Sequence, residues 1–238
     1  MNKTLAKLRN KKRVTIVVAG DSNTIISMNT QGRMNWTGYL QEALWERYGD
    51  GLVTMINVSE CGFTFTRLPP LLESRVLRWQ PDLVIFQLWL ARTDDEPRGQ
   101  AKGRAAFLDT VRRLRQASPA APDILVCTPN PRVLCHGHQV PAGAEPGEVY
   151  ECAEWNAARN AALVRLAREQ GCTVVDHFTA WRRKTYTFAH PGANPRGLWQ
   201  RMIDPVHPNA LGQLMLFREM ASVFGVAKYF PWEETPGD

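Results

Sequence analysis

The sequence predicts an α/β fold in which parallel strands form a central sheet and helices cover both of its faces. Short apolar runs alternate along the chain with longer segments of helical spacing, which is the order that β-α-β units produce. One run, PDLVIFQLWL, is apolar almost throughout, as expected for a strand that is buried on both faces. No repeat or linker divides the 238 residues, so we expect a single domain.

Five strands account for the apolar runs. The run at 14–19 is mostly β-branched, and a second run follows at 53–58. Pro81 opens the long central run, PNP ends the strand at 124–128, and 173–175 is a short fifth strand. We therefore expect a sheet of about five strands and a core spanning residues 14–224. The basic N-terminus and the tail after Pro231 are expected to be peripheral.

Helices are predicted between these strands by apolar residues at spacings of three and four. In 36–48 the apolar positions include Trp36, Leu40 and Leu44, and a short amphipathic helix is expected at 71–79. The segment 102–117 places Phe107 and Val111 on one face. An alanine-rich helix lies within 147–170, and the last helix spans 209–224. The stretches 132–146 and 177–203 are expected to be irregular.

Composition narrows the function classes. Lys and Arg number 29 against 23 Asp and Glu, which gives a net charge of +6. The basic residues are scattered and accompany no nucleic-acid-reading motif, so we expect no nucleic-acid partner. No run is long enough for a transmembrane helix, and the basic start lacks the apolar core of a signal peptide. The five cysteines are irregularly spaced, as in reduced proteins. We expect a cytoplasmic protein that does not bind membranes.

The stretch VTIVVAGDSNT ends the first strand at an acid and a hydroxyl, Asp21 and Ser22. Both residue types are preferred at helix N-caps, so one interpretation is a turn that caps a helix. The other interpretation is a nucleophile displayed at the carboxyl edge of the sheet, where sites form in parallel α/β folds.

A second polar pair, Asp204 and His207, precedes the last predicted helix in DPVHPNALG. At this spacing the carboxylate can hold one imidazole nitrogen and leave the other to accept the proton of a serine hydroxyl. Serine needs such a base to act as a nucleophile. The alternative is another helix cap, with Pro208 in the first helical turn.

Taken together, these motifs resemble the GDSL family, also called SGNH hydrolases. VVAGDSNT resembles its Gly-Asp-Ser block, INVSECGFT its second block, PDLVIFQL the strand leading into its third block, and DPVHPNALG its Asp-x-x-His block. The segment EWNAARNAALVRLAREQGCTVVD is similar to the helix and strand that precede the last block. The resemblance spans residues 14–224 in the expected order and implies a flavodoxin-like three-layer α/β/α sandwich.

This resemblance also implies ester hydrolysis. By position, Ser22 is the nucleophile, His207 the base and Asp204 its orienting acid. The backbone N–H groups of Ser22 and Gly62 are then expected to form the oxyanion hole. Asp21 and Asn23 flank Ser22 and are the expected substrate contacts. The expected substrate is a small-molecule carboxylic ester, with a short acyl (acetyl) ester of a carbohydrate or another small alcohol favoured.

The third block departs from the family, which usually has Gly-x-Asn-Asp after the strand and uses the Asn as a third oxyanion donor. Here the chain reads QLWLARTDD, so Trp89 stands for the Gly and Ala91 for the Asn. A gapped alignment brings Arg92 or Thr93 nearby, and Thr93 is a candidate donor. Losing one donor costs about 10²–10³ in rate. A catalytically impaired binding module is therefore the alternative function.

No metal or organic cofactor is expected. The sequence CHGH places Cys135, His136 and His138 close together, and these are zinc-ligand types. Their spacing matches no standard zinc site, so a loop is the preferred interpretation. Homo-oligomerisation is compatible with the sequence.

Overall fold

A computed structural model of the chain describes residues 1–25, 33–91, 98–117, 120–131, 133–134, 150–151, 153–186 and 207–226. Five strands form one sheet in the order β2-β1-β3-β4-β7, and every pair in it is parallel. The strands are β1 (Val14–Gly20), β2 (Val53–Asn57), β3 (Leu83–Gln87), β4 (Asp123–Cys127) and β7 (Thr173–Val175). The predicted five-stranded parallel sheet is confirmed.

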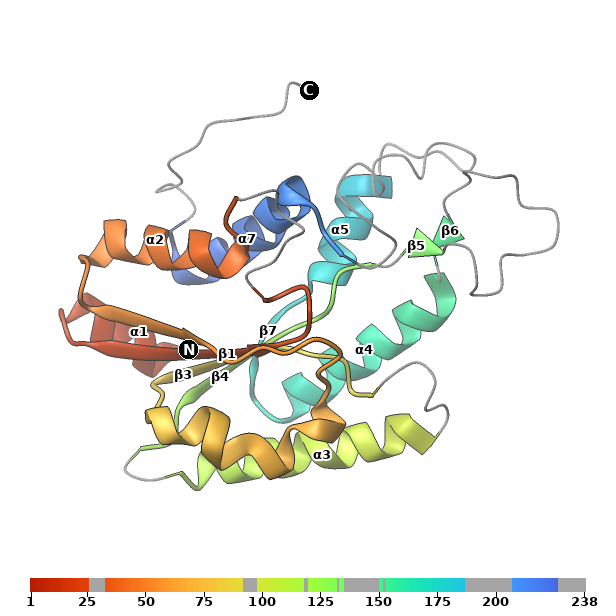
Figure 1. The fold of residues 1–238 in the computed structure, drawn as a ribbon, viewed down its shortest axis with the longest axis horizontal. Coiled ribbons are helices and arrows are strands. Elements are labelled where there is room, and N and C mark those ends of the chain that lie inside the picture. Colours follow the sequence, from red (N-terminus) through yellow and green to blue (C-terminus); the bar gives the residue numbers. More distant parts are fainter. Residues whose placement is uncertain are drawn as a thin grey trace.

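Helices flank this sheet on both sides, with α2 and α7 above it and α3 below it in Figure 1. The helices are α1 (Asn2–Arg9), α2 (Trp36–Tyr48), α3 (Arg98–Arg115), α4 (Ala153–Glu169), α5 (His177–Tyr186) and α7 (Ala210–Phe224). The architecture is therefore the three-layer α/β/α sandwich that the sequence predicts. Within the described residues, no helix combines the length and hydropathy that crossing a membrane requires.

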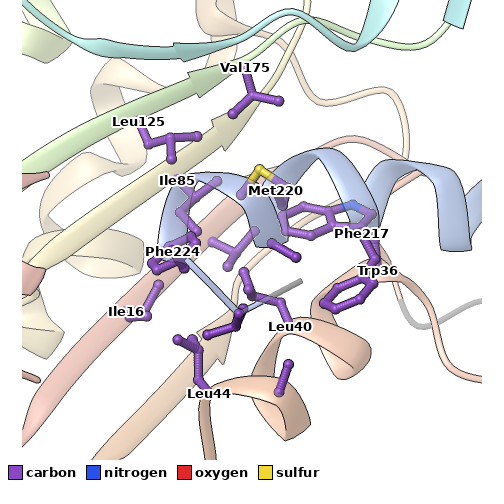
Figure 2. Packing of buried hydrophobic residues seen from close by; sticks show 14 of the residues in the cluster. Ile16, Trp36, Leu40, Leu44, Ile85, Leu125, Val175, Phe217, Met220 and Phe224 are labelled. Carbon is purple, nitrogen blue, oxygen red and sulfur yellow. The ribbon is translucent and has the colours of Figure 1, made fainter. Parts of the chain in front are cut away.

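Two apolar clusters, one on each face of the sheet, join these layers. In the first, side chains of α2 and α7 meet those of the strands (Figure 2). Its members include Ile16, Ile85 and Leu125 from the strands, Trp36 and Leu40 from α2, and Phe217 and Met220 from α7. Neighbouring strand residues such as Val17 and Val84 point into the second cluster. Because the central strands are covered on both faces, they consist of continuous apolar runs.

The second cluster packs α3 against the sheet. The Phe65 ring meets those of Phe86 and Phe107 edge-on, with centroids 5.3 and 5.0 Å apart. Gly103 of α3 lies so close to the chain after β3 that a Cβ atom there would be 2.3 Å from the carbonyl oxygen of Leu90. Helix α3 therefore fixes the position of the third-block segment through direct backbone contact.

Three sequence predictions need correction. The segment 65–79 forms successive 3-10 and π turns, Phe65–Arg67, Pro69–Leu71, Leu72–Val76 and Leu77–Trp79, instead of one helix at 71–79. The stretch expected to be irregular after residue 176 begins with α5. A short antiparallel pair, β5 (Val133–Leu134) with β6 (Tyr150–Glu151), lies at the borders of the other irregular stretch.

The basic N-terminus was expected to be peripheral, and that prediction is wrong. Residues 2–9 form α1, which buries Leu8 completely in the first cluster. The buried Thr4 donates from both its backbone N and its Oγ1 to Asp123 Oδ2, each at 2.8 Å. A hydrophobic contact and a partly buried carboxylate therefore anchor α1 to the start of β4.

Replacing Asp123 with Asn is expected to lower the free energy of unfolding by about 1–3 kcal/mol at pH 7, since hydrogen bonds to a charged group are lost. Burial opposes ionisation of Asp123, but the hydrogen bonds from Thr4 and the N-terminal amine 3.1 Å away hold its pKa below the ordinary value. A lowered pKa stabilises the folded state above the unfolded pKa, and that contribution is lost as pH falls through the folded pKa.

Urea unfolding of both proteins between pH 7 and pH 3 would test this expectation. The difference in stability should begin to shrink near pH 4, where the unfolded carboxylate takes up its proton, and should keep shrinking as pH falls through the lowered folded pKa. Asp109→Asn, which alters a more exposed carboxylate of α3 paired with arginine, is the control and should change little. A difference that stays constant with pH would show that Asp123 stabilises through packing alone.

Candidate active site

Ser22 lies on a tight turn immediately after β1. Asp21 Oδ1 accepts a hydrogen bond from Asn23 N at 2.9 Å, and the Asp21 carbonyl accepts one from Thr24 N at 3.0 Å. Asp21 N in turn donates to the carbonyl of Gln87 at the end of β3, at 3.2 Å. The described residues 21–25 therefore form a hydrogen-bonded turn at the carboxyl edge of the sheet, and the Asp21 carboxylate accepts from the backbone of that turn. Residues 26–32, which a helix cap at this point would precede, lie outside the described residues.

His207 reaches this turn from the other end of the chain. Its Nε2 lies 2.8 Å from Ser22 Oγ, although the two residues are 185 positions apart in sequence. The cap of α7 is Asn209, whose Oδ1 accepts from Gly212 N at 3.1 Å. His207 therefore precedes the cap and is not part of it. The structure brings together the two residues that the sequence assigns as nucleophile and base.

Asp204 and Thr93, the predicted orienting acid and candidate oxyanion donor, lie outside the described residues. Their assignments stay predictions. The zinc-ligand types Cys135, His136 and His138 also lie outside them.

The predicted substrate contacts Asp21 and Asn23 are buried, with only 4% and 2% of their surface exposed. The turn directs these two flanking side chains inward, while Ser22 between them keeps part of its surface. Direct substrate contact by Asp21 and Asn23 therefore stays a prediction, and their burial leaves little of either side chain accessible. Asp21 holds the shape of the turn that presents the serine hydroxyl.

Gly62 lies in the loop after β2 and adopts φ +64°, a left-handed conformation that favours glycine. Two hydrogen bonds tie this loop to the end of β1: Glu60 N donates to the Gly20 carbonyl at 3.1 Å, and Gly20 N donates to Ser59 Oγ at 2.9 Å. The loop that carries Gly62 is thus attached to the strand that carries the nucleophile.

An ion-pair cluster reinforces the same loop. The Glu60 carboxylate binds Arg67 at 2.5 Å and Arg75 at 2.7 Å, and these hydrogen bonds keep the Glu60 pKa below its ordinary value. Both guanidinium groups also lie over the Phe63 ring, at 5.5 and 5.6 Å from its centroid. Ion pairs to Glu60 and cation–π contacts to Phe63 therefore stabilise the loop that contains Gly62.

The third-block segment runs beside the residues that follow Gly62. Trp89 forms a parallel bridge with Thr64, and its carbonyl accepts a hydrogen bond from Phe65 N at 3.0 Å. Trp89 is 7% exposed and Ala91 is 1% exposed. The large Trp89 residue therefore lies just after β3, where the family has glycine. The buried Ala91 offers no side-chain hydrogen-bond donor.

Polar residues that sequence reasoning missed support the nucleophile turn: Asn35 and Gln87 are buried, and Asn57 is partly buried. Asn35 and Asn57 each donate from Nδ2 to the Thr24 carbonyl at 2.7 Å, and Gln87 Oε1 accepts from Thr24 Oγ1 at 2.7 Å. A signal was available in the sequence: Asn57 and Gln87 end two apolar strands, and such ends meet at one edge of a parallel sheet.

Metal-ligand clusters and surface grooves near Ser22 and His207 would indicate what else the site binds. Within the described residues, no group of three His, Cys, Asp or Glu side chains is placed to hold a metal ion. Two surface grooves formed by described residues lie elsewhere, one beside Arg78 and Arg113 and one between α4 and α5. Neither groove is lined by Ser22 or His207.

Several solved structures share the fold of this chain. An acetylxylan esterase, a catalytic mutant of Axe2 from Geobacillus stearothermophilus, superposes with a TM-score of 0.65 at 16% identity over 90% of this chain and 95% of its own. A GDSL-like lipase from Parabacteroides merdae gives 0.65 at 16%, over 90% and 97%. The acetyl xylan esterase AlAXEase gives 0.64 at 20%, over 88% and 99%. The TM-scores and coverages establish a shared fold, and at these low identities they establish the fold alone.

The search of curated proteins finds no match. The family model of the GDSL-like lipase/acylhydrolase family matches residues 18–214, which include Ser22, Gly62 and His207. The chain therefore belongs to the GDSL-like lipase/acylhydrolase family.

Proposed function

We propose that this chain is a serine esterase that hydrolyses short-chain acyl esters, with acetyl esters of carbohydrates or other small alcohols as its substrates. The observation that carries the proposal is the 2.8 Å contact between His207 Nε2 and Ser22 Oγ. An unassisted serine hydroxyl is a weak nucleophile at neutral pH, and an imidazole at this distance can accept its proton as it attacks.

The reaction proceeds in two steps. Ser22 Oγ attacks the ester carbonyl while His207 Nε2 takes the hydroxyl proton, and the backbone N–H groups of Ser22 and Gly62 stabilise the oxyanion. His207 then gives the proton to the departing alcohol, which leaves an acyl group on Ser22. Water, deprotonated by His207, attacks this acyl-enzyme and releases the acid. Asp204 orients the imidazole in this scheme.

The substrate class rests on two further points. Acetylxylan esterases are among the proteins with similar structures, so acetylated sugars are the first substrates to test. Trp89 places a large ring at the carboxyl end of β3, where the family has glycine, and this bulk favours a small acyl group. We expect rates to fall as the acyl chain lengthens.

A second function, a binding module with impaired turnover, is favoured by Ala91. This residue is buried at the position of the family's oxyanion asparagine and supplies no side-chain hydrogen bond. A missing donor lowers kcat by about 10²–10³-fold. The retained Ser22 and His207 contact argues for chemistry, because a module that only binds has no need of an activated serine.

Fluorophosphonate labelling followed by intact-mass measurement tests the proposal. We expect one adduct on the wild type and none on Ser22→Ala. Ser74→Ala removes a hydroxyl on the turns at 65–79 and serves as the matched control, which should label like the wild type. Hydrolysis of acetyl, butyryl and octanoyl esters is then compared. Labelling without turnover of any ester supports the binding module, and absence of labelling on folded wild type overturns the esterase.

A further inference from the structure

The nucleophile and the base are contributed by separate parts of the chain, so their distance depends on how α7 sits against the nucleophile turn. Gln213 lies on α7, less than two helical turns after His207, and is 1% exposed. Its Nε2 donates to the carbonyl of Asn23 at 3.0 Å, and Asn23 is the residue next to Ser22. One buried side chain therefore joins the helix that follows the base to the turn that carries the nucleophile.

The other end of the same amide contacts a third element. Gln213 Oε1 accepts a hydrogen bond from Trp36 N at 3.1 Å. Trp36 begins α2, and its N–H has no partner within the helix because helix N-termini leave their first donors unpaired. Gln213 thus links α7, the nucleophile turn and α2.

Both contacts fix the orientation of the amide. A backbone carbonyl can only accept a hydrogen bond and a backbone N–H can only donate one, so Nε2 must face Asn23 and Oε1 must face Trp36. No other neutral side chain of this length offers a donor and an acceptor side by side. Replacing it leaves a buried carbonyl, a buried N–H, or both without a partner.

Helix α2 is itself tied to the nucleophile turn. Trp36 Nε1 donates to Gln87 Oε1 at 2.9 Å, and the same oxygen accepts from Thr24 Oγ1. Asn35, the cap of α2, donates to the Thr24 carbonyl. From α7, the Gln213 side chain joins this network through its hydrogen bonds to the nucleophile turn and to α2.

We propose that Gln213 is a positioning residue that sets the distance between Ser22 Oγ and His207 Nε2 by locking α7 to the nucleophile turn. The inference rests on the proposed function for its kinetic consequence, and on the hydrogen-bond geometry alone for its structural one. A displacement of about 1 Å between reacting groups can lower a rate about 100-fold. Loss of the Gln213 hydrogen bonds should therefore lower kcat more than substrate affinity.

Two variants separate the contacts. Gln213→Met keeps the length of the side chain and removes both hydrogen bonds. Gln213→Glu keeps an acceptor for Trp36 N but turns a carboxylate oxygen toward the Asn23 carbonyl. The control is Thr110→Val on α3, which also removes a buried hydrogen bond, made within its own helix to the Ala106 carbonyl.

We expect both Gln213 variants to lose about 10–100-fold in kcat and in fluorophosphonate labelling rate per folded molecule, with KM within about twofold. Thr110→Val should lose stability and keep both rates. Rates per folded molecule that match the wild type in Gln213→Met would overturn the positioning role and leave a stabilising one.

A readout independent of turnover separates this inference from the proposed function. The ¹⁵N resonance of His207 Nε2 reports its hydrogen bond to Ser22, and Ser22→Ala gives the value without that bond. We expect Gln213→Met to move the resonance toward the Ser22→Ala value. If the wild type hydrolyses no ester but this shift occurs, the positioning role holds and the proposed function fails. An unchanged resonance overturns the positioning role.

Discussion

Replacing His207 with alanine is expected to lower kcat/KM for a short-chain acyl ester by about 10⁴–10⁶-fold, because the variant loses the imidazole that accepts the serine proton. His207 Nε2 is 2.8 Å from Ser22 Oγ, within reach for direct proton transfer. Fluorophosphonate labelling of Ser22 should slow in parallel, because it depends on the same activated hydroxyl. Substrate binding, which His207 does not carry, should change little.

The measurement is steady-state hydrolysis of an acetyl ester together with the labelling rate, and added imidazole should restore part of the activity of His207→Ala. Asn209→Ala is the matched control: it removes the cap of α7 at a cost of about 1 kcal/mol and keeps the base. Activity that survives in His207→Ala, or that falls equally in Asn209→Ala, would contradict the assignment of His207 as base.

Much of the fold could be predicted because the strands are buried on both faces. Continuous apolar runs at Val14–Gly20 and Leu83–Gln87 identify the centre of a parallel sheet, and α2 begins and ends where its apolar spacing does. The proximity of Ser22 and His207 could also be predicted, because functional residues in such sheets lie at the carboxyl ends of the strands.

Other features depend on tertiary contacts that no local pattern encodes. Residues 2–9 are mostly polar and basic in sequence, yet α1 is anchored to the sheet by the buried Leu8, by Leu5 packing on the first cluster and by the Thr4 hydrogen bonds to Asp123. Asp21 and Asn23 flank the nucleophile in sequence, but the geometry of the turn decides which side chain faces outward. Gln213 is a polar residue in a helix rich in apolar residues, and the approach of the nucleophile turn and α2 explains its burial.

The close packing at the end of β1 makes Gly20 a position where a larger side chain is expected to have a strong steric effect. A Cβ atom at Gly20 would lie 2.1 Å from Thr24 Oγ1 and 2.5 Å from Thr24 Cβ. The hydroxyl could rotate away, but Cβ is fixed to the backbone, so the turn itself would have to move. That turn carries Ser22, and its Thr24 side chain is held by Gln87.

Gly20→Ala is therefore expected to lower the free energy of unfolding by about 3 kcal/mol, the upper part of the range for overpacking. It should also lower kcat/KM per folded molecule about 100-fold through misplacement of Ser22. Urea unfolding and acetyl-ester kinetics measure the two effects. Gly38→Ala is the control, because its Cβ would meet the Met34 side chain at 3.1 Å, a flexible neighbour on a helix where alanine is favoured.

Adding Thr24→Gly to Gly20→Ala removes the three atoms nearest to the new Cβ, at the cost of the hydrogen bond to Gln87. If steric displacement of the turn is the cause, the double variant should be more stable and more active than Gly20→Ala alone, with a coupling energy of about 1–3 kcal/mol. Strictly additive effects would instead mean that Gly20 acts through its own backbone conformation. Because β1, the Gly62 loop and the nucleophile turn all meet at Gly20, the sign of this coupling decides whether close packing at one residue holds the serine in place.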